Sequence, residues 1–285
     1  CETLDGHPID PSEAFWATFA GTVRRAVVGW DGVVLDQSGR HQLYTGPLRH
    51  AVQITATRCP WPGCNTSVRH CQIDHLTVTA PSLSAGAAYI QKALGIAPQA
   101  GGEHPRMGTH NLLLRLGDAL FLEVIAINPQ APVPGRPRWF GLDRLAPDAL
   151  PTLSTWVVRT PDIRASVAAA AEPLGDIEPM SRGALDWLIT IPADGSVPLD
   201  GVAPALIEWQ ADKHPAARLE DKGLQLVQLE IFHPAPARVE RLLASLEIEG
   251  MVVVRSLAAG SSGAAPYLRA YIQTPQGLRQ LSLPT

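Results

Sequence analysis

Three side chains of metal-ligand type lie on separate predicted strands: His75, Glu123 and Glu208. One imidazole and two carboxylates that converge from different strands can bind a divalent metal and leave positions for water or substrate. A metal held in this way polarises a substrate oxygen or activates water. Glu123 and Glu208 are therefore also candidate catalytic groups, because a carboxylate that leaves the metal can carry a proton to or from the substrate.

Each of these residues also has a purely structural interpretation. A glutamate within an apolar strand, such as Glu123 or Glu208, can point outward from a half-exposed sheet, and His75 can be an ordinary histidine at a strand end. Thr155 occupies the position that corresponds to His75 in an internal repeat, and threonine is not a usual ligand for a transition metal. We therefore keep a metal centre and a metal-free binding pocket as alternatives.

Further polar and aromatic residues lie where predicted strands begin or end, and we treat them as candidates for substrate contact. Gly108 would let a ligand approach the backbone, and His110 and Asn111 follow it. The alternative is a turn that Asn111 caps. Two aromatic residues would wall a pocket or anchor a linker, and two basic side chains suit an anionic substrate. The full set is His110, Asn111, Trp139, Phe140, Arg182, Trp209 and His214.

These candidates depend on a repeated order of elements, namely a strand, a helix and then further strands. Two copies are predicted, over residues 72–127 and 152–210. The first has a strand at 73–78, a helix at 82–94 and strands at 111–116 and 119–127; the second has a strand at 153–159, a helix at 162–174 and strands at 187–191 and 204–210. Overlaying residues 206–209 on 121–124 places Glu208 on Glu123.

A third, shorter copy is predicted over residues 224–285. Its elements are a strand at 227–231, a helix at 237–246 and strands near 251–255, 267–274 and 278–283. Such a unit cannot cover its own sheet and must pack against its sibling. We predict an α+β fold in which two curved-sheet units, related by approximate two-fold symmetry, enclose a cleft.

Residues 1–71 differ in character and contain all four cysteines. Cys59, Cys64 and Cys71 lie close together, which indicates a vestigial zinc site, although we favour unliganded thiols. The segment is predicted to be a small α/β unit with a helix at 11–28, a strand at 32–36 and a helix at 47–57.

The composition is that of a globular protein. The chain has 285 residues, 46% hydrophobic and 18% charged, with a net charge of −4. These values exclude a disordered chain, and the charge balance gives no support for a nucleic-acid surface. No apolar run reaches about 18 residues, so we expect no membrane span, and nothing in residues 1–20 is typical of a signal peptide. We expect a cytoplasmic protein whose partner is a small-molecule substrate; the oligomeric state is not indicated.

Residues 72–285 resemble the glyoxalase-like domain of the vicinal oxygen chelate superfamily. The resemblance is carried by Ile-Asp-His-Leu at 73–76, Gly-Thr-His-Asn at 108–111, Leu-Gly-Asp at 116–118, Phe-Leu-Glu at 121–123, Pro-Arg-Trp-Phe-Gly-Leu at 137–142 and Ile-Glu-Trp at 207–209. It implies paired βαβββ modules around a cleft that can hold Zn, Ni, Mn or Fe. It also implies a metal-dependent lyase, isomerase or dioxygenase acting on a small oxygenated substrate, or a metal-free binding protein of the resistance type.

Residues 1–78 resemble a different family, the HNH endonucleases that carry an N-terminal DUF222 region. The carrying segments are Thr-Val-Arg-Arg-Ala-Val at 22–27, Gly-Arg-His-Gln-Leu-Tyr-Thr-Gly at 39–46, Cys-Pro-Trp-Pro-Gly-Cys at 59–64 and Cys-Gln-Ile-Asp-His-Leu at 71–76. The resemblance implies a fusion whose junction includes Asp74 and His75. The asparagine, second histidine and further knuckle of that family are missing after Leu76, so we expect an inactive nuclease fragment.

Overall fold

The computed structural model describes residues 72–183, 185–210, 214–248, 251–257 and 265–282, and the backbone of short strands at 22–23, 26–28, 34–37 and 41–42. The chain divides into two compact units, Cys1–Arg69 and His70–Thr285.

The first unit contains two short antiparallel pairs. β1 (Thr22–Val23) pairs with β4 (His41–Gln42), and β2 (Ala26–Val28) pairs with β3 (Val34–Gln37). The prediction of a helix over 11–28 is therefore wrong at β1 and β2, where β-branched residues favour extended backbone. The strand predicted at 32–36 overlaps β3. The predicted helix at 47–57 and the cysteines Cys59, Cys64 and Cys71 lie outside the described residues.

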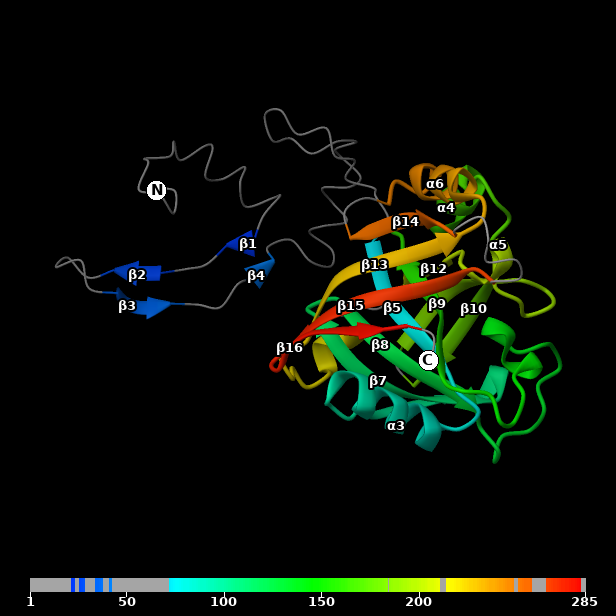
Figure 1. Ribbon diagram of the computed structural model, residues 1–285, viewed down its shortest axis with the longest axis horizontal. Coiled ribbons are helices and arrows are strands. Elements are labelled where there is room, and N and C mark those ends of the chain that lie inside the picture. Colours follow the sequence, from blue (N-terminus) through cyan, green and yellow to red (C-terminus); the bar gives the residue numbers. More distant parts are fainter. Residues whose placement is uncertain are drawn as a thin grey trace. The chain divides into compact units, whose positions relative to one another are not determined.

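The second unit is built on an eight-stranded sheet with the strand order β10-β11-β12-β9-β5-β8-β7-β6 (Figure 1). Two modules contribute four strands each. The first module consists of β5 (Gln72–Thr79), α3 (Leu83–Leu94), β6 (Gln99–His104), β7 (Thr109–Gly117) and β8 (Leu120–Ile127); the second consists of β9 (Thr152–Arg159), α4 (Ile163–Ala169), β10 (Asp176–Arg182), β11 (Leu185–Ile191) and β12 (Ala205–Trp209).

The strand pairing confirms two sibling βαβββ modules. In each module the first strand pairs in parallel with the last, β5 with β8 and β9 with β12. The modules join through the antiparallel pair of β5 and β9. The strand order therefore runs in opposite directions from this central junction, as approximate two-fold symmetry requires.

The helix boundaries follow local capping. Ser82 accepts a hydrogen bond from the backbone N–H of Ala85 at 3.2 Å, and Gly95 ends α3 in the left-handed conformation at φ 76°. The predicted helix at 82–94 is confirmed. Helix α4 ends at Ala169, earlier than predicted. Pro173 disfavours helical backbone at Glu172, which rules out the last part of the predicted helix.

The two edge strands, β6 and β10, were not predicted. The β6 sequence is Gln-Ala-Gly-Gly-Glu-His, and β10 contains Pro179, so neither shows a strand pattern. Glycine and proline are tolerated at a sheet edge. The sheet curls so that these edges approach each other: Arg106 of the short helix η1 (Pro105–Met107) donates hydrogen bonds to Glu178 and to the carbonyl of Pro179.

The third segment covers the outer face of this sheet. It comprises β13 (Gln225–His233), α6 (Pro236–Ser245), β14 (Val252–Ser256), β15 (Tyr267–Thr274) and β16 (Gly277–Leu281). The element order is the predicted one, but the strand order is β14-β13-β15-β16, which places the first strand inside the sheet. The segment therefore pairs its strands differently from the two modules, and Figure 1 shows its sheet lying across β5, β8 and β7.

The two faces of the large sheet belong to different cores. Leu76, Leu122 and Trp156 point to the outer face and share one apolar cluster with α3, α4 and the four-stranded sheet. Alternate residues such as Val157 and Ile189 form a second cluster on the concave face. Among the described residues, the outer face is covered by this packing, and the concave face is the one that carries a pocket.

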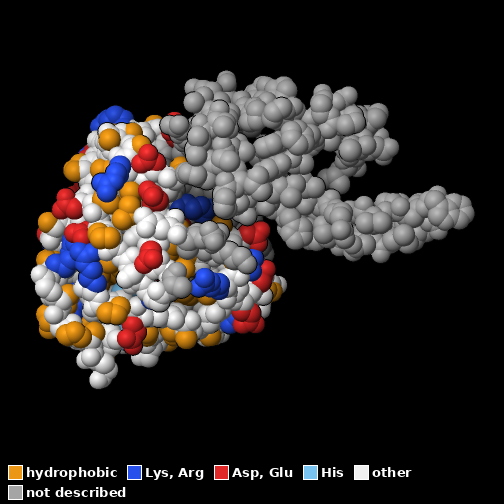
Figure 2. Space-filling model, turned by 180° about the vertical axis from the view of Figure 1, so that it is seen from behind, with side chains coloured by type: hydrophobic (Ala, Val, Ile, Leu, Met, Phe, Trp, Pro, Cys, Tyr) orange, Lys and Arg blue, Asp and Glu red, His pale blue; other side chains and the backbone are white. Residues whose placement is uncertain are grey.

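The remaining connections are short helical turns. They are η2 (Trp139–Arg144), α5 (Pro198–Gly201) and η3 (Pro215–Arg218). Within the described part of the chain, no helix has the length and apolar character needed to cross a bilayer. On the face drawn in Figure 2, Lys and Arg side chains lie among Asp and Glu side chains.

We predict that Gly86→Ala destabilises the protein by about 1–3 kcal/mol. Helix propensity alone would give the opposite sign, by about 1 kcal/mol. However, a Cβ at Gly86 would lie 2.3 Å from Cγ1 of Val124 and would push α3 off the sheet. Urea unfolding at pH 7 measures the difference. Ala88→Gly, at an exposed position of the same helix, is the matched control and should cost about 1 kcal/mol. A Gly86→Ala variant as stable as the parent would contradict the packing.

Candidate functional site

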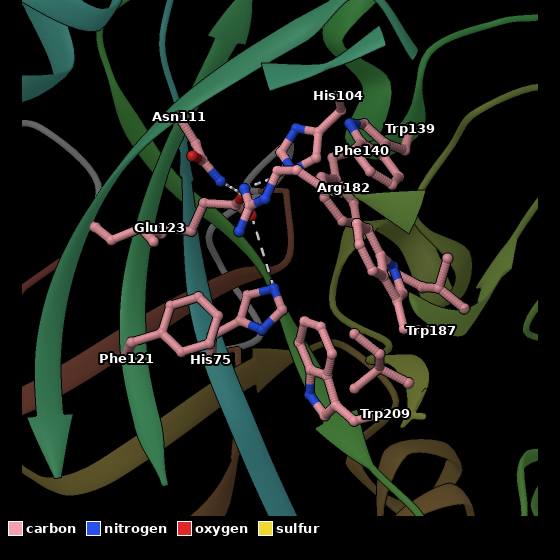
Figure 3. A pocket seen from close by; sticks show the side chains of 13 residues that line it. His75, His104, Asn111, Phe121, Glu123, Trp139, Phe140, Arg182, Trp187 and Trp209 are labelled. Carbon is pink, nitrogen blue, oxygen red and sulfur yellow. Dashed lines mark hydrogen bonds and ion pairs between the residues drawn. The ribbon is translucent and has the colours of Figure 1, made fainter. Parts of the chain in front are cut away.

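A pocket opens on the concave face of the large sheet, between the two modules (Figure 3). It has a volume of about 410 Å³, including the part open to solvent. Polar groups gather mainly on the first module and aromatic groups mainly around the opposite wall. The lining residues are His75, His104, Asn111, Leu113, Phe121, Glu123, Trp139, Phe140, Arg182, Trp187, Ile189, Ile207 and Trp209.

Glu123 is a buried carboxylate held by hydrogen bonds from the sheet. The side-chain amide of Asn111 on β7 donates to Glu123 Oε1 at 2.6 Å. Asn111 Oδ1 in turn accepts from the backbone N–H of Gly102 on β6 at 2.7 Å. Glu123 is 5% exposed and Asn111 4%. This chain fixes the amide orientation and leaves Glu123 Oε2 directed toward His75, with Nε2 and Oε2 3.6 Å apart.

His75 is oriented by the buried carboxylate of Asp74. The Nδ1–H of His75 donates to Asp74 Oδ1 at 2.7 Å, which leaves Nε2 facing Glu123 (Figure 3). Asp74 Oδ2 accepts from Trp209 Nε1 and from His214 Nε2, each at 2.8 Å. A register irregularity between Ile73 and His75 turns Asp74 to this side of the strand.

The environment of Asp74 keeps it ionised. Burial raises the pKa of this carboxyl, but the charges and hydrogen bonds of His214, and then those of His75, outweigh burial and hold the pKa well below its usual range. An ionised Asp74 fixes the imidazole ring and stabilises an imidazolium if His75 takes up a proton.

His104 and Arg182 lie beside Glu123 on the two sheet edges. Arg182 donates from a terminal N–H to His104 Nε2 at 3.3 Å, and His104 Nδ1 lies 3.2 Å from the hydroxyl of Thr109. Burial lowers the pKa of His104 to about 4; Glu123 opposes this shift, whereas Arg182 and His75 add to it. His104 is therefore neutral at pH 7 and accepts from Arg182.

Aromatic rings form the opposite wall. Trp139 stacks on Phe140 with 5.4 Å between centroids and meets His104 edge-on at 5.1 Å. Phe140 and Gly141 both adopt left-handed backbone, at φ 58° and 67°, which places this tight turn over the pocket. A non-glycine residue in that conformation costs free energy and is found where the surroundings demand it.

The strand register tests the predicted relation between the modules. Across the central junction His75 pairs with Val157, and Thr77 pairs with Thr155. If a two-fold axis relates His75 to Thr155, it must also relate Thr77 to Val157. The cross-strand pair His75–Val157 then superposes on the pair Thr155–Thr77, as the symmetry requires. The predicted equivalence of His75 and Thr155 agrees with the structure.

The same register overturns the predicted place of Glu208. Thr77 lies opposite Glu123, and Val157 lies opposite Ala205, so the counterpart of Glu123 is Ala205. The predicted overlay was three residues out of register, and an odd shift moves a side chain to the other face. Glu208 Oε2 accepts the backbone N–H of Ile163 at 2.8 Å, at the start of α4. The prediction that Glu208 converges with His75 and Glu123 is therefore wrong.

The side chains present do not fit a metal centre. His75 and Glu123 and their two symmetric counterparts, Thr155 and Ala205, together provide only two good ligands. The guanidinium of Arg182 beside Glu123 would also repel a cation. Among the described residues, no group of three or more His, Cys, Asp or Glu side chains could hold a metal ion. We derive no chemistry through a metal.

The structure places the predicted substrate-contact residues in two groups. Five of them line the pocket: Asn111, Trp139, Phe140, Arg182 and Trp209. His110 does not, because it precedes Asn111 on β7 and points to the other side. His214 lies behind the pocket, where it bonds Asp74. Their functional roles stay predictions.

Sequence reasoning missed several lining residues. His104 and the Gly101–Gly102 pair lie on the unpredicted strand β6, and a Cβ at Gly101 would lie 2.1 Å from Asn111 Oδ1. Two adjacent glycines before a histidine were the available signal of a close backbone approach. Asp74 was assigned no separate role, although an acidic residue beside a candidate catalytic histidine is a recognisable pattern.

Comparison with known proteins identifies a family model. A model described as a glyoxalase-like domain matches residues 73–247, which is more than half of the chain. No curated protein matches the sequence.

The solved structures that match this chain share little sequence with it. A hypothetical protein from Staphylococcus aureus is 12% identical, with a TM-score of 0.43 over 62% of this chain and 74% of that one. A mutant of 4-hydroxymandelate synthase from Streptomyces coelicolor is 17% identical, with a TM-score of 0.39 over 73% and 61%. Methylmalonyl-CoA epimerase from Mycobacterium tuberculosis is 14% identical, with a TM-score of 0.32 over 48% and 85%.

We predict that His104→Gln weakens the dependence of stability on acid pH. Folded His104 stays neutral down to about pH 4, whereas the unfolded chain takes up this proton near pH 6.5. Stability from this residue is therefore present above pH 6.5 and is lost as pH falls, on the order of 2.5 kcal/mol by pH 4.5. Urea unfolding at pH 7 and pH 4.5 should show a correspondingly smaller loss in the variant. Equal losses in both proteins would refute a neutral, buried His104.

Proposed function

Because the chain belongs to the glyoxalase-like domain family, we propose that its concave pocket binds a small oxygenated molecule and that His75 and Glu123 transfer a proton to or from it. The observation that carries the proposal is the pair itself. An imidazole oriented by a buried carboxylate faces a second carboxylate at 3.6 Å, across the pocket from an aromatic wall. This is an arrangement of general acid–base catalysis.

The two groups are prepared for complementary tasks. Nε2 of His75 faces the pocket, because Nδ1 donates to Asp74, so Nε2 can accept or release a proton. Oε1 of Glu123 is occupied by the Asn111 amide, so Oε2 is the oxygen that can act on a substrate. Proton transfer beside a carbonyl is the chemistry of isomerases and of some lyases, and this pair can perform it with no metal ligand set.

Two alternatives differ in chemistry. The first alternative is a metal-dependent lyase, isomerase or dioxygenase. Its Zn, Ni, Mn or Fe ion would have to be held by His75 and Glu123 alone, since Thr155 and Ala205 occupy the symmetric positions. A metal-free binding protein of the resistance type would use the aromatic wall without turnover, and the pocket geometry is compatible with it.

The predicted resemblance of residues 1–78 to HNH endonucleases stands outside this proposal, and the matched family model begins at residue 73. Asp74 and His75, which the two resemblances share, are both committed to the pocket through their mutual hydrogen bond. That residues 1–78 form an inactive nuclease fragment stays a prediction. A cytoplasmic location also remains a prediction.

We predict that the protein catalyses solvent exchange of protons next to a carbonyl, and that Glu123→Gln or His75→Ala lowers the rate by about 100-fold or more. Pyruvate, 2-oxobutyrate, hydroxyacetone and dihydroxyacetone serve as probes. Proton NMR in deuterium oxide at pH 7, with EDTA present, follows the loss of the α-proton signal.

Two controls make this experiment specific. His110→Ala changes a histidine outside the pocket, and Glu103→Gln changes an exposed carboxylate on β6; both should exchange at the parent rate. Exchange that EDTA abolishes would replace the proposal with the metal-dependent alternative. Exchange that persists in both pocket variants would refute the assigned pair, and binding without exchange would favour the resistance-type alternative.

A further inference from the structure

We infer that Arg182 supplies the positive charge of this pocket in place of a metal ion, and that the ligand is a small oxyanion, a carboxylate in the simplest case. The inference rests on the proposed function and names the substrate class for the same pocket. It follows from the partners, the surroundings and the position of one guanidinium group.

Arg182 lacks an ion pair of the kind that several arginines of the second unit form. Arg106 and Arg136 both pair with Glu178, Arg138 pairs with Asp143 and Arg144 with Asp194. Among the described residues, Arg182 forms no ion pair within 4.0 Å, and its one hydrogen bond goes to neutral His104. A guanidinium has five N–H donors, so several remain for a ligand.

The surroundings make an unpaired cation costly without a ligand. Burial lowers the pKa of Arg182, and the charge of Glu123 opposes that shift. A partly buried guanidinium with no ion pair within 4.0 Å is stabilised further when an anion binds directly to it. The acceptor that orients the group, His104, carries no charge of its own at pH 7, so the ligand side of the guanidinium stays positive.

The chain makes room for Arg182 at this place. A Cβ on Gly102 would lie 2.9 Å from Cδ of Arg182 and 3.2 Å from its Nη1. Glycine at 102 therefore lets the side chain cross from the edge strand β10 to the edge strand β6. The same glycine donates its N–H to Asn111 Oδ1. Gly102 therefore helps to fix the positions of both the Arg182 guanidinium and the Asn111 amide that bonds Glu123.

The position suits a bound oxyanion next to the acid–base pair. Figure 3 shows the guanidinium beside Glu123, on the side of the pocket away from Phe121. A planar guanidinium binds a carboxylate through two parallel hydrogen bonds. A ligand held in this way presents its neighbouring carbon to Glu123 and His75, and the guanidinium would also stabilise negative charge that develops when a proton leaves.

The test compares carboxylates with their neutral amides, which have nearly the same shape. Glycolate and glycolamide, and lactate and lactamide, are titrated at pH 7 with EDTA, and quenching of the pocket tryptophans reports binding. We expect at least one carboxylate to bind about 10-fold or more tightly than its amide. Arg182→Gln should remove this preference, and Arg182→Lys should restore part of it, because lysine keeps the charge but not the fork.

Arg144→Gln is the matched control, since Arg144 is exposed and pairs with Asp194 away from the pocket; it should bind like the parent. Equal affinity for carboxylate and amide, binding by no carboxylate at millimolar concentration, or carboxylate binding unchanged in Arg182→Gln would each overturn the inference. If the Glu123→Gln variant keeps the preference for carboxylates and the parent protein catalyses no proton exchange, the role of Arg182 in binding is upheld and the proposed catalysis is refuted. The two carboxylate probes, pyruvate and 2-oxobutyrate, also separate the two proposals. If their proton exchange is unaffected by Arg182→Gln, the proposed catalysis is upheld and the role of Arg182 is refuted.

Discussion

The pocket depends on one fully buried carboxylate. Asp74 is 0% exposed and receives three hydrogen bonds, from His75, Trp209 and His214. A buried charge is tolerated only when it is paired and hydrogen-bonded, so these three groups cannot move independently of it. They come from β5, β12 and the start of η3, which means that one carboxylate ties the two modules and the following turn together. The ring of His75, and with it the spacing to Glu123, follows from that constraint.

The backbone is nearly symmetric and the chemistry is not. The first module supplies the polar groups His75, His104, Asn111 and Glu123, whereas the second supplies Arg182 and two of the tryptophans. At the symmetric positions Thr155 and Ala205 fill space and bring no charge. In this duplicated scaffold one module carries the candidate reactive groups, and the other forms much of the pocket wall that would contact the ligand.

The sequence was sufficient for the modules and insufficient for their register. Alternating apolar residues, the Ser82 cap and Gly95 defined the first strand and helix, because these signals are local. The repeat also placed Thr155 correctly. Glu208 was misplaced because a similar Leu-Ile-Glu-Trp pattern allowed an overlay three residues out of register, and only strand pairing decides the face of a side chain. His104 and Gly102 were not identified because β6 was not predicted. The β6 sequence has no strand periodicity, and the segment is a strand because it pairs with β7 in the folded protein.

The approach of β6 and β10 has a consequence for solubility. An open sheet exposes two rows of unpaired backbone groups, to which another chain can add a strand. In this protein the edge strands contain Gly101, Gly102 and Pro179, and the Arg106–Glu178 ion pair bridges the region between them. The residues that gave these segments no strand pattern are therefore the ones that discourage strand addition, and the ion pair between the two edges opposes self-association through them.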